Sequence, residues 1–279
     1  MFNNVVVGVD DLERGRDALE LAKAVISDDA EVALVYVEVL QGDPAVETDT
    51  GADAETQRFG LERLGRLRDE LHPGASVSRI QAPSVRDGVH DFAAGRGADL
   101  IVIGAGSREV VAHSVLGDEA REVLENPPCT VAVAPRGYAA HSHRLRSIGV
   151  GYNGSAESEQ ALALARTIAS ERHATLSAFE AVRTAVYPSD IWNVEAQIDD
   201  DVEKARQRIA ALGDVEPRAA FADDAVDGLR RYGASVDLLV VGSHRYRAPD
   251  HLLKHSTSQR LADDPPSPLL VLASAGVNE

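Results

Sequence analysis

The sequence contains the same ordered set of segments twice, and this repetition limits the folds that the chain can adopt. Residues 5–10 (VVVGVD) return at 148–153 as IGVGYN. Residues 98–104 (ADLIVIG) return at 236–242 as VDLLVVG, and a segment with a Pro-Pro pair, NPPCTVAV, has a counterpart in DPPSPLLV. Between the first two segments, apolar residues at helical spacing also coincide. Four matches in one order indicate an internal duplication.

Within each copy, short apolar runs alternate with helical patterns. Unbroken Val/Ile/Leu runs are typical of parallel strands that helices cover on both faces. We expect strands at 4–9, 31–39, 76–81, 99–104 and 130–134, and in the second copy at 147–152, 174–181, 217–221, 237–242 and 268–273. We expect helices at 13–27, 53–71, 84–95 and 117–125. The sequence therefore predicts two tandem doubly wound α/β domains, each with a five-stranded, mostly parallel sheet and helices on both faces.

The boundary between the copies lies in a short segment of small and polar residues. Residues 136–143 read RGYAAHSH. We predict a first domain at 1–137, a linker at 138–144 and a second domain at 145–279.

Composition argues against several classes of function. The 279 residues include 28 basic and 45 acidic side chains, a net charge of −17, which repels nucleic-acid backbones and anionic lipid surfaces. No apolar run approaches the roughly 20 residues of a membrane span, and the N-terminus lacks the basic flank of a secretory signal. The single cysteine, Cys129, cannot form an intrachain disulfide and is expected to be an apolar filler. We therefore expect a cytoplasmic protein.

The order of these segments resembles that of the universal stress protein family. The resemblance rests on VGVD in the first strand, ALVYV in the second, DLIVIG in the fourth and PPCTVAV at the fifth, and both copies match over nearly their full length. It implies a Rossmann-like fold of the HUP type in each half. It also implies a site for ATP, with Mg²⁺, or for another adenine nucleotide.

Family members that bind ATP use a motif of Gly, two residues, Gly, nine residues, and Gly followed by Ser or Thr. Glycines let the backbone approach phosphates closely. The first copy places Gly104, Ser107, Gly117 and Asp118 at these positions, so that a serine replaces the middle glycine and an aspartate replaces the hydroxyl residue. By the same resemblance, Asp10 matches the first-strand aspartate and Val37 the backbone position beside adenine.

The second copy departs from the motif at other positions. Gly242 and the hydroxyl of Ser256 are retained, Arg245 and His255 replace glycines, and Asn153 stands in place of the first-strand aspartate. Neither copy carries the complete motif, so that nucleotide binding through a degenerate loop and loss of binding both stay open.

The loops that carry the motif differ in charge. Residues 104–120 hold one arginine against three carboxylates, a net of −2, and residues 242–256 hold three basic residues against one aspartate, a net of +2. In so acidic a chain, the basic loop is a candidate anion site. Our hypothesis is that the second copy, and not the first, holds whatever phosphate-bearing ligand the protein retains. The alternative is a solvated loop without a ligand.

No pattern of catalytic residues or metal ligands accompanies the repeat. His251 and His255 have the spacing of two zinc ligands on a helix, but the His-Glu-x-x-His arrangement is missing. Neither a P-loop nor a nucleophile elbow occurs. We therefore expect no metal centre and no enzyme beyond slow ATP hydrolysis.

Two functions remain open at this point. The first is a stress-response regulator that binds an adenine nucleotide, and the alternative is a nucleotide-free interaction or scaffold protein on the same fold. The resemblance also implies that the last strands, residues 131–134 and 269–272, pair edge to edge, which would make the chain an intramolecular pseudo-dimer and allow a homodimer. An unknown protein partner is expected in either case.

Overall fold

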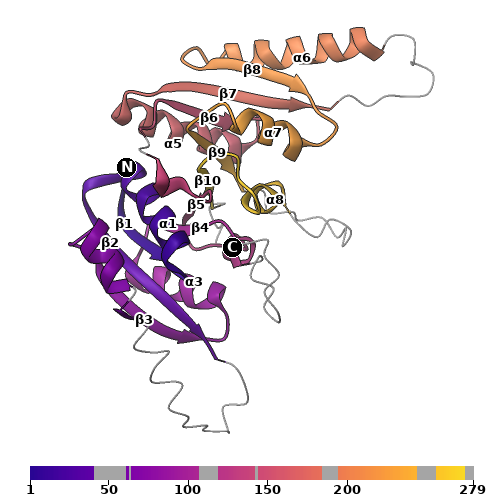
Figure 1. The fold of residues 1–279 in the computed structure, drawn as a ribbon. Helices are drawn as coiled ribbons and strands as arrows, with labels where there is room; N and C mark the ends of the chain where they lie inside the picture. The colour runs from indigo at the N-terminus through magenta and orange to yellow at the C-terminus, as the bar shows by residue number, and fades with distance from the viewer. Residues whose placement is uncertain are drawn as a thin grey trace. The chain divides into compact units, whose positions relative to one another are not determined.

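The fold is known from a computed structural model that describes residues 1–40, 61–62, 64–106, 119–141, 144–183, 194–243 and 256–273. The chain forms two compact units, Met1–His143 (unit 1) and Arg144–Glu279 (unit 2). Figure 1 shows the helices and strands of both units along the chain. In the described part of the chain, no helix is both long and apolar enough to span a membrane.

Unit 1 is built on a parallel sheet of five strands in the order β3-β2-β1-β4-β5. The strands are β1 (Phe2–Gly8), β2 (Ile26–Val39), β3 (Ser76–Ala82), β4 (Leu100–Gly104) and β5 (Thr130–Ala134). The strand order reverses between β1 and β4, and ligands of open α/β sheets bind beyond the carboxyl ends of strands at such a point.

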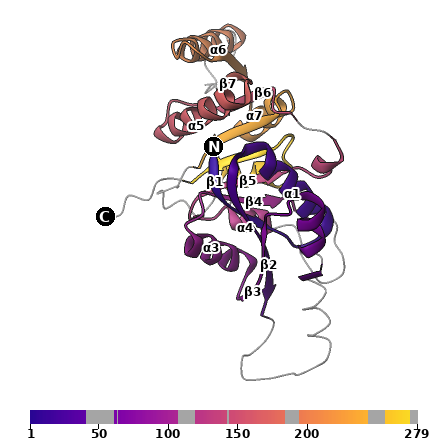
Figure 2. The ribbon, with the colours of Figure 1, turned by 90° about the vertical axis from the view of Figure 1, so that its left-hand side faces the viewer.

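Helices lie on both faces of the sheet of unit 1. They are α1 (Leu12–Val25), α3 (Val85–Arg96), the short α4 (Glu119–Val123) and a helix that includes residues 61–62 and 64–71. In Figure 2, α1 and α3 lie on opposite sides of the strands. The aliphatic side chains of β1 and β4 are almost completely buried between them, as a doubly covered sheet requires.

Unit 2 repeats this architecture, with the parallel strand order β10-β9-β6-β7-β8. Its strands are β6 (Ser147–Gly151), β7 (Thr175–Val182), β8 (Glu216–Phe221), β9 (Leu238–Gly242) and β10 (Leu269–Leu272). Its helices are α5 (Ala156–Arg172), α6 (Val194–Ala210), α7 (Ala225–Gly233) and α8 (Thr257–Ala262). The predicted fold class is confirmed.

The first helix ends earlier than the sequence pattern predicts. The expected helix at 13–27 stops at Val25, and Ile26 is already extended. The reason is tertiary pairing: Ile26 pairs with Phe2 at the start of β1, and an irregularity follows before Asn4 pairs with Glu31. The expected helix at 53–71 is described only at 61–62 and 64–71, and 117–118 also lie outside the described residues.

The residues that follow β5 pack onto α1. Tyr138–Ala140 form a short 3-10 helix, η1, and the Tyr138 side chain is buried. The buried carboxylate of Asp17 on α1 accepts hydrogen bonds from the backbone N–H groups of Gly137 (2.8 Å) and Ala139 (2.7 Å). The first residues of the predicted linker are thus anchored to unit 1.

Two helices end in the same left-handed conformation with different residues. The α3 C-cap is Gly97 (φ 63°, ψ 38°), and the α5 C-cap is the exposed His173 (φ 53°, ψ 41°). A side chain with a Cβ is strained there, which costs about 1 kcal/mol. We expect His173→Gly to raise the free energy of unfolding by about 1 kcal/mol in urea titrations followed by circular dichroism. The matched Gly97→His should lower it by a similar amount, and a loss of stability in His173→Gly would contradict this account.

Candidate functional site

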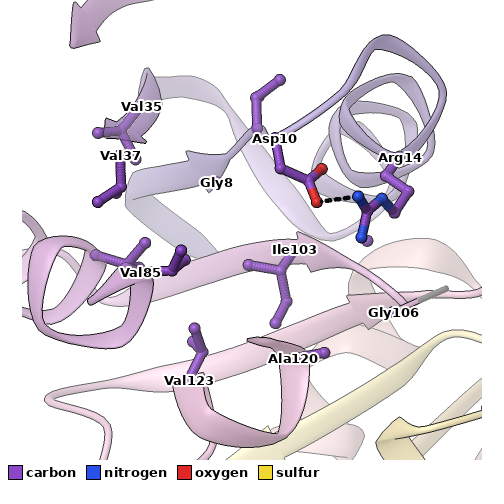
Figure 3. A pocket seen from close by; sticks show the side chains of 13 residues that line it. Gly8, Asp10, Arg14, Val35, Val37, Val85, Ile103, Gly106, Ala120 and Val123 are labelled. Carbon is purple, nitrogen blue, oxygen red and sulfur yellow. Dashed lines mark ion pairs between the residues drawn. The ribbon is translucent and has the colours of Figure 1, made fainter. Parts of the chain in front are cut away.

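Unit 1 has a small, mostly aliphatic pocket at the point where its strand order reverses. The cavity measures about 50 Å³. It is lined by Gly8, Val9, Asp10, Arg14, Val35, Val37, Val85, Val89, Ile103, Gly104, Gly106, Ala120 and Val123. Figure 3 shows valine and isoleucine side chains from the sheet and from α3 and α4 around it. Such walls suit an apolar group and provide few hydrogen bonds for a polar one.

The polar edge of the unit 1 pocket is an ion pair. The Arg14 guanidinium lies 2.5 Å from the Asp10 carboxylate, as the dashed line in Figure 3 marks, and 2.6 Å from Asp11, the N-cap of α1. Burial acts to raise the pKa of Asp11, but hydrogen bonds from the Arg14 backbone and guanidinium outweigh it and hold this pKa below its ordinary value. Asp10, which we predicted as a ligand contact, is therefore already paired with a cation of the helix that follows it.

The other predicted residues of the first copy are only partly described. Val37 and Gly104 line the pocket. Gly106 also lines it, and its carbonyl accepts hydrogen bonds from Nε (3.2 Å) and Nη2 (2.9 Å) of Arg136. Ser107, Gly117 and Asp118 lie outside the described residues.

Unit 2 has a larger pocket at the equivalent place. Its cavity measures about 270 Å³. It is lined by Gly151, Tyr152, Asn153, Ser155, Glu157, Ser158, Phe179, Glu180, Ala181, Ala225, Leu229, Val241, Gly242, Ser256, Thr257 and Ser258. The residues from β7, α7 and β9 are mainly apolar, and those at the starts of α5 and α8 carry hydroxyl and amide groups and the carboxylate of Glu157. The pocket therefore has an apolar part and a hydrogen-bonding part.

The start of α5 forms one polar wall of the unit 2 pocket. Ser155 is the N-cap of α5, and its hydroxyl accepts a hydrogen bond from the Ser158 backbone N–H. The Asn153 side-chain oxygen accepts one from the backbone N–H of Ser155 (3.1 Å), which holds the turn after β6. The exchange of Asp10 for Asn153 thus removes a negative charge from this turn while it keeps a polar side chain there.

The retained hydroxyl of the second copy is part of a helix cap. Ser256 and Gln259 form a capping box at α8, and the Ser256 hydroxyl also lies 3.0 Å from that of Ser258. Gly242 lines the pocket as predicted, whereas Arg245 and His255 lie outside the described residues.

Tyr152 and Glu180 also line the unit 2 pocket, and both have polar partners. The Tyr152 hydroxyl donates a hydrogen bond to Glu159, which together with burial raises the pKa of Tyr152 to about 12. Glu180, on β7, accepts a hydrogen bond from Arg208 at 2.5 Å. Sequence reasoning missed both residues because their equivalents in the first copy are an ordinary apolar and an ordinary aromatic residue. Tyr152 corresponds to Val9, and Glu180 corresponds to Tyr36.

Cysteine and metal chemistry receive no support from the described residues. Burial raises the pKa of the Cys129 thiol to about 12, so that the reactive thiolate is scarce at neutral pH. Within the described ranges, no group of three or more His, Cys, Asp or Glu side chains could hold a metal ion. His251, like His255, lies outside these ranges.

Comparisons with known proteins agree with the repeat and the fold. The model of the universal stress protein family matches residues 1–135 and 144–273. A universal stress protein from Archaeoglobus fulgidus DSM 4304 has a similar structure (TM-score 0.68, 17% identity, 99% of this chain and 98% of that chain covered). So does a functionally unknown protein from Pseudomonas aeruginosa PAO1 (TM-score 0.61, 17% identity, 97% and 92% covered). No curated protein matches the sequence significantly.

Proposed function

Because the chain belongs to the universal stress protein family, we propose that it is a stress-response regulator that binds an adenine nucleotide in the pocket of unit 2. One observation supports this choice of pocket. The unit 2 cavity measures about 270 Å³ and joins an apolar part to a hydroxyl-rich part, whereas the unit 1 cavity measures about 50 Å³ and is mostly aliphatic. A nucleotide needs both kinds of surface, one for its base and one for its ribose and phosphates.

The parts of the unit 2 pocket correspond to the parts of the proposed ligand. Phe179, Ala181 and Leu229 would face the base, and Asn153 and Ser155 would hydrogen-bond the ribose or a phosphate. With ATP, Mg²⁺ would arrive bound to the phosphates, since the described residues supply no metal-binding group of three side chains. The ion would reduce the repulsion between the phosphates and the carboxylates of this acidic chain.

We propose that the ligand acts by being bound and not by being transformed. The described residues that line the pocket include the carboxylates of Glu157 and Glu180 but no histidine, cysteine or lysine, so that none of the serines among them has an imidazole base beside it in the lining. We also propose a cytoplasmic location and a protein partner that responds to the occupied pocket. The pairing of the two last strands in a pseudo-dimer, and a homodimer of such chains, stay predictions.

The proposal can be tested by filling either pocket with a bulky side chain. Ala225 and Val85 are the first residues of α7 and α3, are half-buried, and line the pockets of units 2 and 1. We expect isothermal titration of the full chain with ATP and AMP, each with Mg²⁺, to show binding to the wild type. Ala225→Trp should weaken it at least tenfold because the indole occupies the cavity, and the matched Val85→Trp should leave it within twofold.

The possible results separate the alternatives. Loss of binding in Val85→Trp and not in Ala225→Trp would mean that the ligand binds in the pocket of unit 1 and not in that of unit 2. No heat and no change in melting temperature up to millimolar nucleotide would overturn the proposal and leave the nucleotide-free interaction protein. Binding that neither variant weakens would place the ligand outside both pockets.

A further inference from the structure

The pocket of unit 2 has an aromatic wall made by two stacked side chains. Phe179 on β7 lines the pocket, and its ring stacks on that of Tyr232 from α7 with centroids 4.7 Å apart and planes inclined by 14°. Both residues are almost completely buried. Stacked rings in this geometry attract each other beyond the area that they bury, so that Tyr232 fixes the orientation of Phe179.

A glycine and a serine hold Tyr232 in place. A Cβ on Gly149 would lie 2.6 Å from the Tyr232 hydroxyl, so that this ring fits over β6 only because residue 149 has no side chain. The hydroxyl lies 2.6 Å from the buried Ser177 Oγ, which satisfies a polar group inside the unit. Desolvation raises the pKa of Tyr232 to about 12, so that it stays a neutral phenol.

The described part of unit 1 lacks this arrangement although its backbone is equivalent. The pair Gly149 and Ser177 of unit 2 corresponds in strand register to Val6 and Ala33 of unit 1. Phe179 corresponds to Val35, because the backbone carbonyl of each accepts a hydrogen bond from the backbone N–H of the residue that follows the first strand of its own unit. The aromatic residue of α3, Phe92, is half-exposed and contacts Arg96. Among the residues that the structure describes, the aromatic wall therefore occurs in unit 2 and not at the equivalent positions of unit 1.

We propose that Phe179, positioned by Tyr232, is the residue that selects a planar heteroaromatic ring in the pocket of unit 2. This inference rests on the proposed function and adds to it the residue that recognises the base. Phe179 lines the pocket together with the apolar residues Ala181 and Leu229. A base packs there by its π-face or ring edge, and the ribose extends toward the polar part.

Two probes divide the ligand into its parts. Adenosine carries the base without phosphate, and ribose 5-phosphate carries the phosphate without the base. We expect Phe179→Leu, which keeps an apolar side chain of similar size, to weaken adenosine at least tenfold and to change ribose 5-phosphate less than twofold. Tyr232→Phe retains the ring stack and should change adenosine binding less than threefold, although it leaves the Ser177 hydroxyl without its partner. Isothermal titration calorimetry of the full chain measures the affinities for both probes.

A control variant separates recognition from general loss of packing. Phe92→Leu removes the aromatic ring at the equivalent helix position of unit 1 and should leave both affinities unchanged. Adenosine binding that survives Phe179→Leu, or an equal loss for both probes, would overturn this inference and leave the proposed function standing. No binding of adenosine, ATP or ribose 5-phosphate by the wild type would overturn the proposed function and the inference with it.

Discussion

Gly242→Ala is expected to destabilise the ligand-free protein by about 3 kcal/mol. A Cβ at this position would lie 2.6 Å from the backbone oxygen of Glu157 and 2.7 Å from its carbonyl carbon. These atoms belong to the first turn of α5 and can yield only if the helix moves away from β9. Gly104→Ala in unit 1 should have a similar cost, because its Cβ would lie 2.7 Å from Cβ and 3.0 Å from the backbone oxygen of Arg14.

Gly95→Ala is the matched control for these two substitutions. Gly95 is exposed on α3, and nothing lies within 4 Å of the Cβ that alanine would add. We expect this variant to be more stable by roughly 0.5–1 kcal/mol, since alanine is the better helix former. Thermal denaturation without nucleotide should therefore show lower melting temperatures for Gly104→Ala and Gly242→Ala and a slightly higher one for Gly95→Ala.

The result bears on what the first glycine of the motif is for. If stability falls in the absence of ligand, this glycine is required for close packing of a helix on a strand in both copies. Its presence then says little about nucleotide binding, even where the rest of the motif has changed. If Gly242→Ala left the ligand-free protein unaltered and weakened only ATP binding, the glycine would serve the phosphates instead, and our packing account would be wrong.

The strands of both units could be predicted from sequence because a strand that is buried on both faces appears as an unbroken run of apolar residues. Residues 130–134 are a strand in the prediction and in the structure, and the other strand predictions differ from it mainly at their ends. The longest difference is at the start of β2, where 31 was expected and Ile26 is observed. Pairing with Phe2 decides that position, and a contact so distant in sequence leaves no periodic pattern.

The candidate site was predictable in its position and less so in its chemistry. Asp10, Val37, Gly104, Asn153, Gly242 and Ser256 all line the two pockets, although their roles in binding stay predictions. The ion pair of Asp10 with Arg14 was not predicted, nor was the capping box of Ser256. The Phe179–Tyr232 stack also escaped sequence reasoning, because it depends on Gly149 on a third element. Such contacts follow from strand register and helix placement, which the sequence motif does not specify.

Asp17→Ala should also have a large effect, in the segment of unit 1 that follows β5. The buried Asp17 carboxylate is the acceptor for two backbone N–H groups, those of Gly137 and Ala139. Alanine would remove the charged acceptor of both hydrogen bonds, and a hydrogen bond to a charged group contributes roughly 1.5–3 kcal/mol. We expect a destabilisation of about 3 kcal/mol and faster amide hydrogen exchange at residues 137–140. The exposed Asp91 on α3 offers a control, since Asp91→Ala should change stability by less than about 0.5 kcal/mol.

The Asp17 result would also decide where the first domain physically ends. Sequence alone placed the linker at 138–144, yet Tyr138 is buried and the turn before it is bonded to α1. The equivalent position in α5 is Gln160, which is exposed, so that unit 2 has no buried carboxylate at this position. If Asp17→Ala frees residues 137–140 and lowers stability, these residues belong to the folded body of unit 1, and the free connection starts after them. Unchanged exchange at Gly137 and Ala139 would show that the carboxylate is dispensable and that the segment behaves as a linker.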